Sequence, residues 1–503
     1  MERDLGRLEG DEHDLLVIGA GIQGACIAWD AALRGLRVAL VERDDFGAAT
    51  SANSLRIVHG GLRYLSRGDF PRMRESVRER TALLRVAPGL VQPLPVLIPT
   101  GPPGVPPKMA LGAALALTHL LSLHRNRHLP SDHRIGAGRL LSRAECLELV
   151  PALESVSITG GALWFDARMR RPERLTLAFV RSAAAQGAVV ANYAEADGFD
   201  IVGGAVRSVE VVDRLGGRRH EVRARQVVIA AGPWSDELAA RTGRRAASPA
   251  GARQHAWGLN LVIGRRLGEA AVGLRAGASS EADPGGTGGR FLFMVPQDRS
   301  TLLGTWYGLA DGEEPGTAPE RGEAYLLDAF NRACPGLGLS PGDVVARQLG
   351  RLPLKAGLER GPAIGLAERP RVVGRERSGP SNLLTVEAVK YTTARAVAEG
   401  VVDAVLASMG LEPRACRTAG TPLVGGGSTG TPEPLDQRIR RAVTEEMAVT
   451  LSDVVFRRTE LGDPPGPEEE SVRVAARIAG DALGWDQRRR AEEEATVLRA
   501  EAV

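Results

Sequence analysis

Residues 14–42 constrain the fold of this chain more than any other segment. They begin with a short apolar run of strand length at 15–18, which a glycine-rich turn follows at once. Residues 22–32 are rich in small side chains and are typical of a helix. A second apolar run at 38–41 then closes on an acid, Glu42. This order predicts a strand, a tight turn, a helix and a second strand, the unit that opens a doubly wound α/β sheet.

The glycines of this unit have the spacing Gly19-x-Gly21-x-x-Gly24. The first permits the tight turn, the second lets a pyrophosphate approach the backbone, and the third lets the helix lie close to the sheet. The helix N-terminus then offers N–H groups and a positive dipole end to phosphates. Glu42 can accept both hydroxyls of an adenosine ribose. The whole context predicts a dinucleotide site, and the alternative is a glycine-rich turn without a ligand.

The bulk properties exclude several classes of protein. A chain of 503 residues is too long for one core, so we expect two or three domains. With 64 basic and 61 acidic residues, the charge balance gives no case for a nucleic-acid partner. Four scattered cysteines without a CxxC spacing suit a reducing cytosol and argue against a metal site. The charged N-terminus lacks the apolar core of a secretory signal, so we expect a cytoplasmic protein.

Residues 109–123 form an apolar stretch that follows a proline-rich linker. His124, Arg125, Arg127 and His128 come directly after it. Such a helix can lie in a membrane interface with its basic end at the headgroups, on the inner face of the cell membrane. The alternative, equally consistent with the pattern, is a helix buried in the core.

A second informative stretch, residues 50–65, follows the second predicted strand. Gly60 and Gly61 would let a planar ring approach the backbone. His59 can take a proton from a substrate hydroxyl or amine, and Arg63 can hold a carboxylate or phosphate by two hydrogen bonds. The alternative is a loop in which His59 and Arg63 make ordinary structural contacts. Lysine is rare in this chain, so Lys390 can mark a place that needs a compact ammonium. The alternative is a surface lysine at the start of a helix.

Five strings together resemble the FAD-dependent glycerol-3-phosphate dehydrogenases, which belong to the D-amino-acid-oxidase-like and glutathione-reductase-type flavoproteins. They are VIGAGIQGACIAWDAALRG, ATSANS, HGGLRYL, AAGPW and KYTTARAVAE. The resemblance implies an α/β and α+β fold, with a Rossmann-like FAD-binding domain, an antiparallel substrate sheet and a C-terminal helical domain. The expected FAD-binding segments are 14–100, 161–240 and 381–410. The expected linker with its apolar helix is 101–160, the substrate domain 241–380, and the helical domain 415–503.

The same resemblance assigns roles to individual residues. His59 matches the proposed base, Lys390 a lysine near the flavin and the substrate, and Arg63 and Tyr64 substrate-binding positions. The residues that would contact FAD are Gly19, Gly21, Gly24, Glu42, Thr50, Ser51, Ser54, Gly60, Gly61, Gly232 and Thr392.

The chain also departs from the pattern of the resembled family. Arg351 stands one position away from the family arginine, so it would need a local bulge to point the same way, and Lys355 could replace it. Trp306 and Tyr307 stand where an acid and a smaller residue are usual. The glycines before the lysine are replaced by Ala388 and Val389. The second family arginine has no clear counterpart, and the nearby candidates are Arg369 and Arg371.

The resemblance implies oxidation of glycerol 3-phosphate to dihydroxyacetone phosphate, with hydride passing to flavin N5. Electrons would go to a membrane quinone or to oxygen. An alternative keeps the flavin and changes the substrate, because a pocket with Trp306 and Tyr307 in place of thin polar residues could admit a larger, more apolar hydroxy acid or an amino compound. A third interpretation is a non-catalytic nucleotide-binding module, and an NAD-only dehydrogenase is a further option. The sequence leaves a homodimer open.

Overall fold

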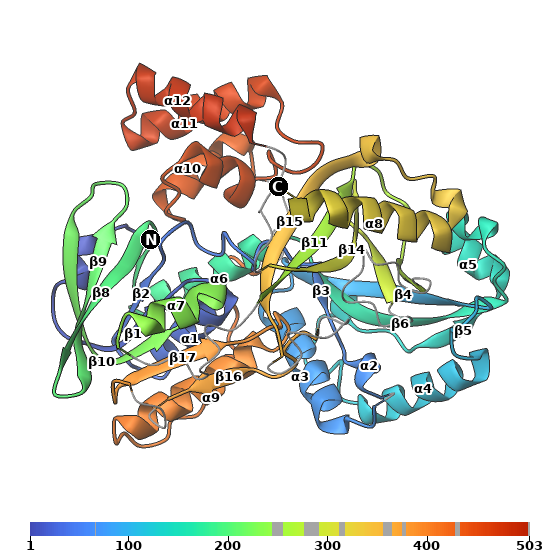
Figure 1. Cartoon of the computed structure of the whole chain (residues 1–503), viewed down its shortest axis with the longest axis horizontal. Coiled ribbons are helices and arrows are strands. Elements are labelled where there is room, and N and C mark those ends of the chain that lie inside the picture. The colour runs from blue at the N-terminus through green and yellow to red at the C-terminus, as the bar shows by residue number, and fades with distance from the viewer. Residues whose placement is uncertain are drawn as a thin grey trace.

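The computed structural model describes residues 1–65, 67–243, 255–275, 291–310, 317–355, 365–374, 379–427 and 433–500. Two sheets lie side by side, and a helical C-terminal domain packs over the junction between them (Figure 1). The α/β fold with its helical end agrees with the fold class predicted from the sequence.

The first sheet has eight strands among the described residues, and it contains the predicted nucleotide unit. β1 pairs in parallel with β2 and β10, and β10 pairs in parallel with β17. Antiparallel β16 forms one edge of this path, and the β8–β9 hairpin extends from β10. The strands are β16 (Arg371–Val373), β17 (Leu383–Glu387), β10 (Arg219–Ile229), β1 (His13–Ile18), β2 (Val38–Val41), β7 (Val189–Ala191), β8 (Ala194–Val202) and β9 (Ala205–Asp213).

The second sheet has nine described strands, and most of its pairs are antiparallel. Its strands are β15 (Val344–Pro353), β11 (His255–Ile263), β14 (Thr301–Leu309), β13 (Phe291–Pro296), β12 (Ala271–Arg275), β4 (Val91–Thr100), β6 (Gly160–Met169), β3 (Ile57–Val58) and β5 (Arg139–Leu141). Sheet membership does not follow the predicted segments strand by strand. β4 and β6 come from the segments predicted as FAD-binding or linker and pair in the second sheet, whereas β16 comes from the predicted substrate domain and pairs in the first. Strand pairing between distant segments decides this membership, and local sequence patterns do not record it.

The helices cover the sheets and build the C-terminal domain. α1 packs between α6 and α9 through a core of small and apolar residues on one side of the first sheet. The helices are α1 (Ile22–Leu33), α2 (Leu62–Leu65), α3 (Phe70–Val86), α4 (Lys108–Leu121), α5 (Arg143–Leu149), α6 (Pro172–Ala185), α7 (Ser235–Ala240), α8 (Thr317–Ala333), α9 (Ala394–Ser408), α10 (Leu435–Thr444), the π-helical turn η7 (Asp453–Arg458), α11 (Glu469–Leu483) and α12 (Gln487–Arg499).

Helix α4 corrects one alternative from the sequence. It is apolar, but it lies on the surface, and Leu115 is its one buried residue. Met109 is 86% exposed and Leu120 is 64% exposed, so the helix does not belong to the core. None of the helices in the described part of the chain is both long and apolar enough to span a membrane.

Candidate active site

The glycine-rich turn lies at the C-terminal end of β1, where the backbone must reverse beside β10. Gly19 has φ +100°, and a Cβ there would lie 2.7 Å from the carbonyl oxygen of Ala230. A Cβ on Gly24 would lie 1.8 Å from the carbonyl oxygen of Gly19, so this glycine lets α1 pack against the turn. Gly21 is the N-cap of α1, and it lines a cavity that starts here. Gly19 and Gly24 therefore have the turn and packing geometry that the spacing predicted.

Glu42 ends β2 beside this turn. Its carboxylate accepts hydrogen bonds from the backbone N–H of Ala20 (2.7 Å) and of Asp44 (3.1 Å). Burial raises the pKa of Glu42, and these two N–H groups oppose that effect. Each oxygen still has a free lone pair for a further donor, and the residue lines the cavity. This is the arrangement that a ribose diol needs.

Arg43 and Trp234 lie at the same end of the cavity. The guanidinium carbon of Arg43 is 4.1 Å from the centroid of the Trp234 ring, a cation–π contact. Gly232, predicted to contact the cofactor, precedes Trp234 with φ +56° and also lines the cavity. The pairing of Arg43 with Trp234 was not predicted from the sequence, although Trp234 belongs to the AAGPW string.

Three hydroxyls predicted to contact the cofactor line the same cavity and also brace its walls. Ser51 Oγ accepts a hydrogen bond from the N–H of Ile22 (3.0 Å), in the first turn of α1. Thr50 Oγ1 donates a hydrogen bond to the carbonyl oxygen of Arg351 (3.2 Å) and accepts one from its N–H (3.2 Å). These two hydrogen bonds connect the segment after β2 to β15. Ser54 Oγ accepts from the N–H of Arg56 (3.3 Å).

His59 lines the cavity with a side chain that is 43% exposed. Its Nδ1 lies 3.5 Å from Oδ2 of Asp166 on β6. Its backbone N–H donates to Oγ1 of Thr392 (3.3 Å), a residue that was predicted to contact the cofactor. Asp166 is a neighbour of His59 that the sequence analysis missed, because it lies 107 positions further along the chain. The WFDAR string that contains it carries no recognisable spacing to His59.

The two glycines after His59 serve different purposes. Gly61 has φ +82° and lines the cavity. A Cβ on Gly60 would lie 2.1 Å from Nη1 of Arg80 and 2.8 Å from Oδ1 of Asp166. Gly60 therefore leaves room for a buried ion pair, and it borders a separate small chamber rather than the main cavity.

Tyr64, Lys390 and Arg63 form a cluster in the cavity wall. The Lys390 ammonium donates a hydrogen bond to the Tyr64 hydroxyl, and Arg63 Nη2 donates to the same oxygen (3.1 Å). Burial favours the neutral phenol, but these two donors outweigh it and hold the pKa of Tyr64 below its usual range. Lys390 lies 326 positions after Tyr64 in the sequence, and the fold brings the two side chains into contact.

The other predicted cations are distributed unevenly. Arg351 and Lys355 line the cavity, whereas Arg369 and Arg371 are absent from its described lining. The register of β15 with β11 is continuous through Arg351, so the expected bulge is not present there. The Arg351 guanidinium instead stacks on Trp257, 5.3 Å from its ring centroid. Arg67 lines the cavity too and was not predicted.

The two aromatic residues that replace the usual pattern on β14 behave differently. Trp306 is fully buried in the core of the second sheet, where Gly308 and Gly322 pack against its ring. Tyr307 lines the cavity. Successive residues of a strand point to opposite faces, so one of the two aromatic residues enlarges the core and not the pocket.

These residues line one cavity with a volume of about 1070 Å³, which has walls from both sheets. Its lining includes Gly19 and Glu42 of the nucleotide unit together with Tyr64 and Lys390. The donor-rich helix N-terminus, the acceptor carboxylate and the size of the cavity fit a dinucleotide.

Comparison with known proteins identifies the group. Residues 14–403 match the model of a family described as FAD dependent oxidoreductase. This chain belongs to that family. The oxidoreductase is 32% identical over 433 residues to a glycerol-3-phosphate dehydrogenase of Synechocystis sp., which covers 84% of this chain and 75% of the relative. It is 31% identical over 522 residues to glycerol-3-phosphate dehydrogenase 1 of Mycobacterium tuberculosis, covering 93% and 95%.

A solved structure gives the same fold. The glycerol-3-phosphate dehydrogenase from Bacillus halodurans, complexed with FAD, superposes with a TM-score of 0.72 at 24% identity, covering 98% of this chain and 95% of that one. The resemblance inferred from the sequence is thereby confirmed. The oxidoreductase is an FAD-dependent enzyme, and its cavity has the residues to hold that cofactor.

Proposed function

We propose that the oxidoreductase converts glycerol 3-phosphate to dihydroxyacetone phosphate. Bound FAD supplies the hydride acceptor. The observation that carries the proposal is the wall beside His59, where Arg63, Lys390 and Tyr64 present two cations and a hydroxyl to one cavity. The names of the relatives in Synechocystis and Mycobacterium support the same substrate.

Each residue then has a definite task. His59 accepts the proton of the C2 hydroxyl as the hydride leaves. Arg63 binds the phosphate by its guanidinium, with Arg351 and Lys355 as further cations on the cavity wall. Lys390 stabilises negative charge on the substrate oxygen and at the reduced cofactor.

A second candidate keeps the flavin and exchanges the phosphate for a carboxylate. The observation in its favour is that Arg369 and Arg371, the possible second arginine, do not line the described cavity. Arg63 would then bind a hydroxy acid or an amino compound. The burial of Trp306 weakens this candidate, because the pocket gains one aromatic residue instead of two.

The test is anaerobic reduction of the purified yellow protein. Glycerol 3-phosphate should bleach the flavin absorbance within seconds, while glycerol, which lacks the phosphate, should not. Bleaching by a 2-hydroxy acid or an amino acid, with no response to glycerol 3-phosphate, would replace the first proposal with the second. A bound flavin that no member of this panel reduces would favour a non-catalytic module.

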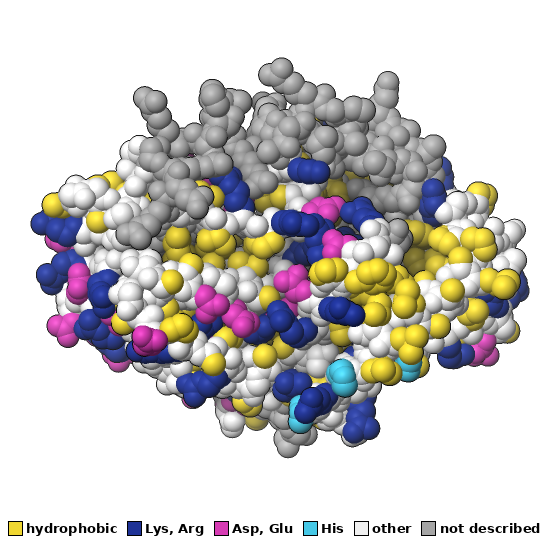
Figure 2. Space-filling view, turned by 90° about the horizontal axis from the view of Figure 1, so that it is seen from below, with side chains coloured by type: hydrophobic (Ala, Val, Ile, Leu, Met, Phe, Trp, Pro, Cys, Tyr) yellow, Lys and Arg dark blue, Asp and Glu magenta, His cyan; other side chains and the backbone are white. Residues whose placement is uncertain are grey.

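We further propose that α4 docks on the inner face of the cell membrane and that a quinone accepts the electrons. Three apolar residues support this, because Met109, Leu120 and Leu123 are 86%, 64% and 61% exposed. Figure 2 shows hydrophobic side chains gathered on the right of the face seen from below, with histidine and basic side chains beside them. Such an edge suits anionic headgroups.

Flotation with vesicles of anionic lipid tests the docking. Leu120→Asp in α4 should reduce the floated fraction several-fold. Val202→Asp is the matched control, because Val202 is 53% exposed on the distant β8–β9 hairpin, and it should float like the wild type. Equal flotation of both variants would contradict the docking, and oxygen would then be tested as the electron acceptor.

The homodimer is a separate question, and sedimentation velocity tests it by measuring the mass of the protein in solution.

A further inference from the structure

A buried carboxylate and a buried guanidinium lie directly behind His59. Oδ1 of Asp166 accepts hydrogen bonds from the N–H of Gly60 (2.7 Å) and from Nη1 of Arg80 (2.9 Å). The same nitrogen of Arg80 donates to the carbonyl oxygen of Phe165 (2.7 Å). Asp166 is 5% exposed and Arg80 is 4% exposed. The carboxylate is therefore held in place by fixed donors on one oxygen, while its other oxygen faces His59.

This arrangement determines which ring nitrogen of His59 meets a substrate. Nδ1 faces Oδ2 of Asp166 at 3.5 Å, and the imidazole lines the main cavity. A carboxylate accepts a hydrogen bond but cannot donate one, so it favours a proton on Nδ1. Nε2 then carries the lone pair and can accept a proton from the cavity side. The carboxylate also stabilises the imidazolium that forms when His59 takes that proton.

The electrostatics of the pair keep Asp166 ionised. Burial would raise the pKa of Asp166, but the contact with His59 and the charge of Arg80 outweigh it and hold that pKa below its usual range. Arg80 is thus the counter-charge that allows a carboxylate to stay buried beside the histidine. Gly60 belongs to the same unit, because any side chain there would displace the pair.

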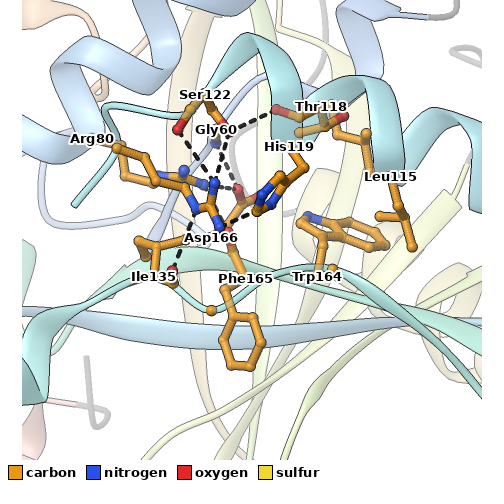
Figure 3. Close-up of a pocket in the computed structure, with 14 residues that line it drawn as sticks. Gly60, Arg80, Leu115, Thr118, His119, Ser122, Ile135, Trp164, Phe165 and Asp166 are labelled. Carbon is orange, nitrogen blue, oxygen red and sulfur yellow. Dashed lines mark hydrogen bonds and ion pairs between the residues drawn. The ribbon is translucent and has the colours of Figure 1, made fainter.

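A small chamber of about 30 Å³ lies on the far side of the pair. In Figure 3, Leu115, Thr118 and His119 of α4 face Trp164 and Asp166 across it. Nε of Arg80 and Nε1 of Trp164 are buried, and neither has a hydrogen-bond partner among the described residues. Both residues line the chamber, which has room for one or two waters. Water there would satisfy both donors and complete the support of Arg80.

We propose that Asp166 and Arg80 are positioning residues that hold His59 as the Nδ1–H tautomer with Nε2 toward the substrate. The inference deepens the proposed function, since it takes His59 as the base. No group on the pair reacts with substrate. Its contribution is the orientation and charge stabilisation of the imidazole.

The first experiment uses Asp166→Asn in the FAD-loaded enzyme. Anaerobic stopped-flow reduction by glycerol 3-phosphate should slow by about 10²–10³-fold with little change in KM, as expected when a base loses its orienting carboxylate. Arg80→Lys keeps the cation but changes its geometry, so its rate should fall by a smaller factor, about tenfold.

Thr118→Val on α4 is the matched control. It borders the same chamber, and its hydroxyl donates a hydrogen bond within its own helix to the carbonyl oxygen of Ala114 (2.7 Å). Its reduction rate should equal that of the wild type. Reduction by Asp166→Asn at the wild-type rate would overturn the proposal. If Asp166→Asn fails to bind FAD, a wild-type rate for Arg80→Lys would overturn it equally.

A second measurement needs no substrate. In protein with ¹⁵N-labelled histidine, the His59 resonances, assigned by their loss in His59→Asn, should report an Nδ1–H tautomer in the wild type and a mixture in Asp166→Asn. An unchanged tautomer would refute the positioning role. Because this signal does not depend on turnover, failure of the glycerol 3-phosphate proposal would leave the positioning test intact.

Discussion

Glu446, between α10 and η7, makes the sharpest prediction about how the C-terminal domain docks. Its carboxylate accepts hydrogen bonds from Arg174 Nη2 (2.9 Å) and from Arg181 Nη1 (2.8 Å), both on α6 of the FAD-binding domain. The Glu446 side chain is 1% exposed. We therefore predict that Glu446→Gln loosens the attachment of the C-terminal helices shown at the top of Figure 1.

Two routes give the magnitude. Burial opposes ionisation of Glu446, but the hydrogen bonds and charges of the arginines outweigh it and lower the pKa from 4.5 to about 2. By proton linkage, that displacement corresponds to about 3 kcal/mol of folding free energy at neutral pH. Removal of one partner from a buried ion pair costs about 3–5 kcal/mol in other proteins. We expect a loss of about 3 kcal/mol.

The pH dependence follows from the direction of the shift. The folded pKa is below the unfolded one, so the stabilisation is complete above about pH 4.5 and is lost as the pH falls toward about 2. Urea unfolding, followed by circular dichroism and tryptophan fluorescence, should show a large difference between wild type and Glu446→Gln at pH 7. The difference should be smaller at pH 3.

The neighbouring Glu445 supplies the control. It is 59% exposed and lies 3.7 Å from Arg181, so Glu445→Gln should change the free energy of unfolding by less than about 0.5 kcal/mol. Equal effects of the two variants, or a Glu446→Gln effect that does not depend on pH, would refute the reasoning.

Three further predictions concern the cavity. Glu42→Gln should raise the FAD dissociation constant at least about tenfold, because the glutamine amide has one oxygen and cannot accept hydrogen bonds from both Ala20 and Asp44. The fluorescence of the flavin released on dialysis measures this change. Arg63→Ala should raise KM with a smaller change in kcat in steady-state assays, and an equal fall in kcat and kcat/KM would make Arg63 a transition-state group. Lys390→Met should lower kcat about 10²-fold in the same assays, and a wild-type kcat would remove Lys390 from the mechanism.

The sequence by itself determined the local units of the site. The turn at Gly19 and the acid at Glu42 depend on backbone conformation within one strand–helix–strand unit, so their spacing was sufficient to predict the nucleotide end of the cavity. The same holds for the helices near 22, 172 and 394, whose patterns are local. His59 and Lys390 were identified because they lie in strings that the resemblance covers.

Tertiary structure decided the rest, because pairing between distant segments leaves no local signal. The partnership of Asp166 and Arg80 with His59 exists only after β6 and α3 pack against the loop that carries Gly60. Trp306 points into the core because its face of β14 packs against α8, and this packing cannot be seen in the sequence. The same apolar sequence pattern is consistent with a buried helix and with an exposed one. Only the packing of the neighbouring elements determined that α4 lies on the surface.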